Sequence, residues 1–170
     1  LEREGLVQSI PNKGVIVKGI SAKDIEDIYT IRMMIEGLAA RWAAEKITRE
    51  GLAELTEAVE LEEFYTSKHD AERLLKFDTR FHDILFKASR SRPLNHMLSM
   101  FHHYVQRART ASLSDPERAA MVLDEHKAIL DAITRGDPDE AEKLTTKHIR
   151  NASVHILSQL KQTPGQPAKP

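Results

Sequence analysis

Asp78 and His82 are the first residues whose types and spacing suggest chemistry. They are four positions apart, so on an α-helix they lie one turn from each other on a single face. Leu74, Phe81 and Leu85 share that face, which makes it the apolar side of the predicted helix. A polar side chain directed into a core needs a partner inside the protein or a bound ion. We therefore expect Asp78 and His82 to have such a partner.

Two further histidines, His126 and His148, lie in apolar stripes of later predicted helices. One carboxylate and three imidazoles could converge inside a helical bundle and bind a metal ion. This ligand set suits zinc, nickel, manganese, iron(II) or cobalt rather than calcium. The alternative is a hydrogen-bonded His–Asp network that contains no metal. Glu125 adjoins His126 and is therefore expected to point away from the ligand face, and we assign no role to His102.

Arg32 and Arg109 are the candidates for binding an acidic ligand. Arg32 lies near the apolar face of the first predicted helix, and a guanidinium can hold a carboxylate in a bidentate manner. The alternatives for Arg32 are a salt bridge with Glu36, four residues later, or extension to the surface. Arg109 follows Val105 by one turn and can reach the interior from the same side of its helix.

Composition narrows the class of protein. The chain has 170 residues, of which 41% are hydrophobic and 30% charged, as in a soluble globular protein. Its net charge of −1 gives no overall field for nucleic acid, and the lack of cysteine excludes disulfides and thiolate zinc sites. No H-E-x-x-H or E-x-x-H motif occurs. Without a signal peptide or an apolar run long enough to cross a membrane, the expected compartment is the cytoplasm.

From residue 21 onward, the apolar spacing is helical almost without a break, and capping residues precede each helix. Short connections between the helices predict an all-α fold, an antiparallel bundle of about six helices. The expected helices cover residues 21–46, 48–67, 70–89, 91 to beyond 105, 114–136 and 137 to about 162. The segment 163–170, with three prolines and a glycine, is expected to be a disordered tail.

Residues 1–20 have a different pattern. Residues 1–5 resemble the last turn of a helix, and two strand-like runs at 6–9 and 15–17 flank a turn at Pro11–Gly14. A two-stranded hairpin is marginal by itself, so it should belong to a structure that lies mostly upstream. The alternative is an irregular N-terminal arm. The start at Leu1 rather than Met also suggests a fragment of a longer protein.

Four segments of this chain resemble one protein family when they are taken in order. They are residues 28–44, the Asp78-x-x-x-His82 stretch with Phe81, residues 125–133 and residues 136–148. Over roughly residues 21–160 the chain is similar to the FCD domain, the C-terminal effector-binding domain of the FadR subgroup of GntR-family bacterial transcription regulators. Residues 1–20 resemble the wing and end of a truncated winged helix-turn-helix, the DNA-binding domain of that family.

The resemblance implies a cofactor, partners and a site. A divalent transition metal, with zinc first among the candidates, would bind to Asp78, His82, His126 and His148. A small organic acid would bind beside it, and a homodimer would respond by changing its affinity for operator DNA. Lys13, at the wing tip, would contact the DNA backbone. The resemblance thus predicts a regulator and not an enzyme, with no membrane partner. The alternative is a metal-dependent enzyme that acts on small carboxylates or esters.

Overall fold

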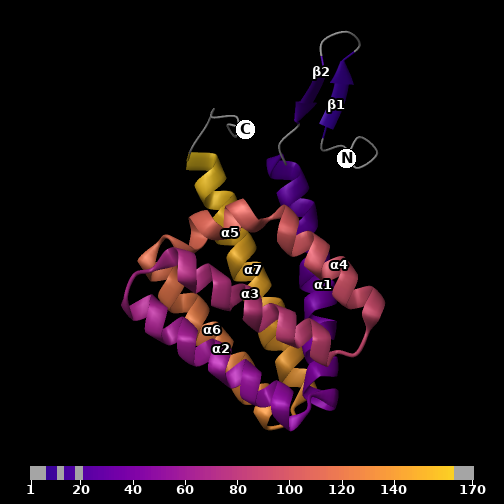
Figure 1. The fold of residues 1–170 in the computed structure, drawn as a ribbon, viewed down its shortest axis with the longest axis vertical. Helices are drawn as coiled ribbons and strands as arrows, with labels where there is room; N and C mark the ends of the chain where they lie inside the picture. The colour runs from indigo at the N-terminus through magenta and orange to yellow at the C-terminus, as the bar shows by residue number, and fades with distance from the viewer. Residues whose placement is uncertain (1–6, 11–13, 18–20, 163–170) are drawn as a thin grey trace.

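Seven helices and two short strands make up the part of the chain that the structure, a computed structural model, describes: residues 7–10, 14–17 and 21–162 (Figure 1). The helices are α1 (Ala22–Lys46), α2 (Arg49–Ser67), α3 (Ala71–Ala88), α4 (Arg92–Tyr104), α5 (Gln106–Leu113), α6 (Pro116–Thr134) and α7 (Pro138–Gln162). The expected all-α bundle is therefore confirmed. The predicted helical turn at residues 1–5 and the predicted tail at 163–170 lie outside the described residues.

The count of helices differs from the expected six because the fourth predicted helix is two helices. Val105 separates α4 from α5 and leaves helical geometry, with φ −95° and ψ 9°. Its side chain is buried in an apolar cluster with Ile25 and Tyr29 of α1. This packing against α1 coincides with the break between α4 and α5. The spacing of apolar residues within the segment does not reveal it. Arg109 and Ser112 of α5 are both buried.

The two strands, β1 (Val7–Ile10) and β2 (Gly14–Val17), pair in antiparallel fashion, with Val7 opposite Val17 and Ile10 opposite Gly14. Two short strands were expected in this region. That the hairpin is the remnant of a winged-helix domain, with a domain boundary near residue 20, stays a prediction.

The predicted helix starts are made by side-chain caps. Ser21 and Asp24 form a capping box at α1, with Asp24 N donating to Ser21 Oγ at 3.1 Å. Thr48 and Asp70 accept backbone hydrogen bonds at the starts of α2 and α3, each at 3.1 Å. Gly136, with φ +64°, follows the end of α6, where a residue with a side chain would be strained. These local signals set the lengths of the helices.

Helices α1 and α7 have the most extensive contact in the bundle. Gly37 permits this approach, because a Cβ atom at that position would lie 2.5 Å from Thr146 Oγ1 and 3.2 Å from the Glu142 carbonyl oxygen. No helix in residues 21–162 is both long and apolar enough to span a membrane.

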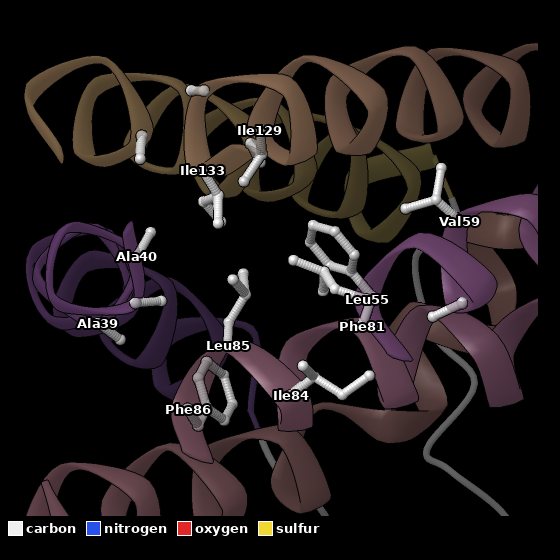
Figure 2. Packing of buried hydrophobic residues seen from close by; sticks show 14 of the residues in the cluster. Ala39, Ala40, Leu55, Val59, Phe81, Ile84, Leu85, Phe86, Ile129 and Ile133 are labelled. Carbon is white, nitrogen blue, oxygen red and sulfur yellow. The ribbon is translucent and has the colours of Figure 1, made fainter. Parts of the chain in front are cut away.

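The main apolar core surrounds α3, which contacts α1, α2, α4 and α5. Figure 2 shows Phe81 and Leu85 of α3 pointing toward Ile129 and Ile133 of α6. All four side chains are buried. Because α3 also carries Asp78 and His82, this packing fixes one side of the polar cluster described next.

Candidate metal centre

Three histidines predicted as metal ligands meet inside the bundle. His82 of α3, His126 of α6 and His148 of α7 are buried, and each offers a nitrogen within 4.8 Å of the others. His126 Nε2 and His148 Nε2 are 3.4 Å apart. The ring centre of His82 is 5.3 Å from each of the other two ring centres. Helices far apart in the sequence therefore bring these three imidazoles together.

Asp78 lies beside this cluster but is shared with an arginine. Its Oδ1 atom is 3.9 Å from His126 Nε2, while Oδ2 accepts a hydrogen bond from Arg109 Nη2. Burial acts to raise the pKa of Asp78, but the Arg109 guanidinium outweighs burial and holds that pKa well below its usual range. Asp78 is therefore an anion with one oxygen toward the histidines.

A carboxylate oxygen lies next to the Nδ1 atom of each histidine. His148 Nδ1 lies 2.7 Å from Glu125 Oε2, and His126 Nδ1 lies 2.8 Å from Glu62 Oε2. His82 Nδ1 lies 3.1 Å from Glu36 Oε2, although this pair misses hydrogen-bond geometry. Metal-binding histidines commonly donate their second nitrogen to a carboxylate, which fixes the tautomer and raises the basicity of the ligand nitrogen. The donor set thus fits a transition metal.

The expectation that Glu125 points away from the ligand face missed its role. On α6 it does lie beside His126, but it reaches across to His148 on the neighbouring helix α7. Arg118 binds both oxygens of Glu125, at 3.1 and 2.9 Å, and Asn151 donates to Oε1 at 2.7 Å. Burial raises the pKa of Glu125, but these partners lower it to about 2. Glu125 is therefore an anion, so His148 must donate through Nδ1.

Burial affects the pKa values of the histidines unequally. Burial, with the nearby His126 and His82, lowers the pKa of His148 to about 3 against the opposing effect of Glu125. Burial also lowers the pKa of His82. For His126 the effect of burial is outweighed by Glu62, and its pKa is raised. Neutral His82 and His148 have a lone pair available for a metal ion, as ligation requires.

Arg32 is buried, with an exposed fraction of 2%, and the alternative of an internal salt bridge is confirmed: Nε lies 2.5 Å from Glu36 Oε1. The same Glu36 oxygen lies 3.2 Å from His102 Nε2. Arg109 Nη1 lies 3.0 Å from His102 Nδ1. His102 therefore joins the two arginines that were predicted to bind an effector.

His102, Glu62 and Arg118 are buried members of this network that sequence reasoning missed. His102 follows the buried Leu98 by one helical turn, so the signal for its burial was present. Glu62 likewise falls seven residues after the buried Leu55. For Arg118, in the first turn of α6, we find no comparable signal.

A cavity adjoins the histidine cluster. Its empty volume is about 330 Å³, part of it open to solvent. The charged, histidine and tyrosine side chains of its lining are Tyr29, Arg32, Asp78, His82, Arg109, Arg118 and His148. A small acid in this space would contact both the arginines and the predicted metal ligands, so the structure places Arg32 and Arg109 at one cavity, as their predicted shared role requires.

A row of hydrogen bonds begins at the cavity, which Ser112 lines, and runs through His155 to Asp115. His155 Nδ1 is 2.9 Å from Ser112 Oγ, and His155 Nε2 is 3.1 Å from Asp115 Oδ2. Asp115 also caps α6 by accepting from Glu117 N at 3.0 Å. These hydrogen bonds connect α5, α7 and the start of α6.

The fold and the site together define the class of the chain: an all-α bundle with a buried polar cluster beside a cavity. The family model of the FCD domain matches residues 27–151, and the chain belongs to this family of GntR-type transcription regulators. The repressor NanR of Cronobacter sakazakii (strain ATCC BAA-894) is 30% identical over 190 aligned positions, which cover 96% of this chain and 70% of NanR. The galactonate operon transcriptional repressor of Escherichia coli (strain K12) is 31% identical over 134 residues, 78% of this chain and 57% of the repressor.

Solved structures agree on the fold. E. coli McbR/YncC matches with a TM-score of 0.81 at 19% identity, over 94% of this chain and 80% of that chain. A metal-free FCD domain matches with a TM-score of 0.71, also at 19% identity, over 85% of this chain and 99% of that domain. The resemblance inferred from sequence is confirmed. The chain is a regulator domain, which removes the alternative of a metal-dependent enzyme that acts on small carboxylates or esters.

Proposed function

We propose that this domain binds a divalent transition metal through Asp78, His82, His126 and His148. The observation that carries this proposal is that three buried imidazoles converge within 4.8 Å, each with a carboxylate behind it. Nitrogen and oxygen donors in this number suit zinc, with nickel, manganese, iron or cobalt as alternatives. Burying these polar groups without a shared partner would be costly.

The second part of the proposal is that a small carboxylate effector binds in the adjoining cavity. The bound metal would supply a positive centre for a carboxylate oxygen. Arg32 and Arg109 line the same cavity and would orient the acid. Their pairing with Glu36 and Asp78 holds the guanidinium groups in place before the ligand arrives. Such preorganisation lowers the entropic cost of binding.

The output would be a population shift between two arrangements of a homodimer, with different affinities for operator DNA. Exposed apolar residues support a second copy as partner: Ile31 and Met34 on α1, and Met97 and Met100 on α4, two helices that contact each other. DNA would be bound by the winged helix-turn-helix that precedes this domain. Lys13, its proposed DNA contact, lies outside the described residues. This role places the protein in the cytoplasm.

The test uses the full-length regulator that contains this domain. Binding to its operator fragment is measured with the metal present while small organic acids are titrated in. The proposal predicts that at least one acid changes DNA affinity, that chelation of the metal abolishes this response, and that Arg32→Lys weakens it because a point charge replaces a planar fork. A regulator that responds to the same acid, at the same concentration, after its metal has been removed would contradict the proposal.

A further inference from the structure

Two of the arginines in the cavity lining carry nitrogen atoms without a hydrogen-bond partner. Arg32 Nη1 and Arg118 Nε are buried and unpartnered, and the exposed fractions of the two residues are 2% and 3%. The hydroxyl group of Tyr29, in the same lining, is also buried without a hydrogen bond. Buried polar groups in native proteins nearly always have a partner, and a cationic donor left without one is costly. These three groups therefore have no hydrogen-bond partner among the described residues.

The two arginines are connected to different histidines, each through a carboxylate. Arg32 binds Glu36, which lies beside His82, and Arg118 binds Glu125, which lies beside His148. Each arginine is thus held in place by its own carboxylate. Each still has one donor nitrogen without a partner, Nη1 in Arg32 and Nε in Arg118. A single carboxylate at Arg32 and the metal would leave the Arg118 group unpaired, so a second acceptor is needed.

The apolar residues of the lining limit which chemical group can connect the two acceptors of a ligand. Leu113, Val122 and Ile156 are apolar parts of the cavity wall. They favour a short hydrocarbon between two polar ends, because burying further hydroxyl groups against them would cost free energy.

We propose that the effector is a short-chain dicarboxylate and that Arg118 is the residue that selects it. One carboxylate would bind at the metal and Arg32, as in the proposed function on which this inference rests. The other would accept a hydrogen bond from Arg118 Nε. A carboxylate is favoured over a hydroxyl group because charge-assisted hydrogen bonds to a guanidinium are the stronger kind.

The test compares diacids with monoacids of equal chain length on the zinc-loaded chain. Isothermal titration calorimetry is run with malonate and propanoate, succinate and butanoate, and glutarate and pentanoate. At the best chain length, the diacid should bind about tenfold to a hundredfold more tightly than its monoacid, the range expected for one hydrogen bond to a charged group. In Arg118→Met this preference should disappear, so that the diacid binds no more tightly than its monoacid.

Asn151→Ala is the matched control, because Asn151 also donates to Glu125 but is absent from the cavity lining. It should keep the preference for the diacid. Zinc content by elemental analysis must match the wild type in each variant. If Arg118→Met does not fold, Arg118→Lys replaces it and should lose most of the preference, since lysine has no Nε–H donor at that position.

Three results would contradict the inference, and each would exclude a different part of it. Equal affinity for diacid and monoacid at every chain length would exclude a dicarboxylate effector. A diacid preference that survives in Arg118→Met would remove Arg118 from the site. Failure of the zinc-loaded wild type to bind any acid would instead overturn the proposed effector site, and this inference with it.

Discussion

Glu125 on α6 accepts a hydrogen bond from His148 on α7, with 2.7 Å between Oε2 and Nδ1. The bond connects two helices that each carry a proposed metal ligand, since His126 follows Glu125 in the sequence. It also fixes the proton of His148 on Nδ1, which directs the lone pair of Nε2 toward His126 Nε2, 3.4 Å away. One carboxylate thus prepares a ligand nitrogen.

Glu125→Gln should therefore weaken metal binding. The amide oxygen is a poorer acceptor than a carboxylate, so we expect a loss of affinity of about tenfold to a hundredfold, as for other partners of metal-binding histidines. Competition with a chromophoric chelator measures the change. Glu63→Gln is the control, because Glu63 is exposed and pairs with Lys127 at the surface. Equal losses in the two variants would show that Glu125 has no special role.

The buried pair of Arg32 and Glu36 gives a prediction about stability. Arg32→Met leaves the Glu36 carboxylate without its main partner, and we expect the free energy of unfolding to fall by about 3–5 kcal/mol. Urea unfolding in the presence of a chelator measures this. Lys23→Met breaks the exposed pair with Asp27 and should change the free energy of unfolding far less, because solvent screens that pair. A cost for Arg32→Met as small as that of Lys23→Met would contradict this account.

The close approach of α1 and α7 should be sensitive to one methyl group. Gly37→Ala places a Cβ atom 2.5 Å from Thr146 Oγ1, and the expected loss of stability is about 1–3 kcal/mol, as for other overpacked sites. Thr146→Ala in the same chain should restore part of this loss. Thermal unfolding of the two variants would test it, and a double variant no more stable than Gly37→Ala would place the strain elsewhere.

Much of the fold could be predicted from the sequence because it is set by local signals. Ser21, Thr48 and Asp70 cap helices as expected, and Gly136 follows the end of one. The break at Val105 could not be predicted in this way. It coincides with the packing of Val105 against residues far away in the chain, and no glycine or proline marks it.

The candidate site was predictable to the extent that it follows helix faces. The spacing of apolar residues placed Asp78, His82, His126 and His148 on inward faces, and the structure brings them together. Glu125 could not be found by that reasoning, since it lies off the face of its own helix and acts on the next one. Contacts between neighbouring helices are a property of the packed bundle.

The pKa of His148 predicts how the chelator-treated protein responds to acid. Burial lowers this pKa to about 3, whereas the unfolded chain should titrate near 6.5. Between these values the unfolded state binds a proton that the folded state does not, so the free energy of unfolding should fall as pH falls from about 6.5 toward 3. The raised pKa of His126 acts in the opposite direction.

For that reason the effect of His148 is measured as a difference. Urea unfolding from pH 7 to pH 4 is compared between the wild type and His148→Gln. The variant should show a smaller loss of stability with acid, whereas His103→Gln, at an exposed position, should follow the wild type. Identical pH dependence in the wild type and His148→Gln would contradict a buried neutral His148.

Metal content is the most direct measurement of the central claim. The wild type and His126→Ala are purified without chelator, supplied with zinc or nickel, and examined by elemental analysis and thermal unfolding. We predict one metal ion per chain in the wild type and a higher melting temperature with metal, because binding stabilises only the folded state. Both effects should be absent from His126→Ala. A wild-type protein that retains no metal under these conditions, or a His126→Ala variant that binds metal equally well, would contradict the account.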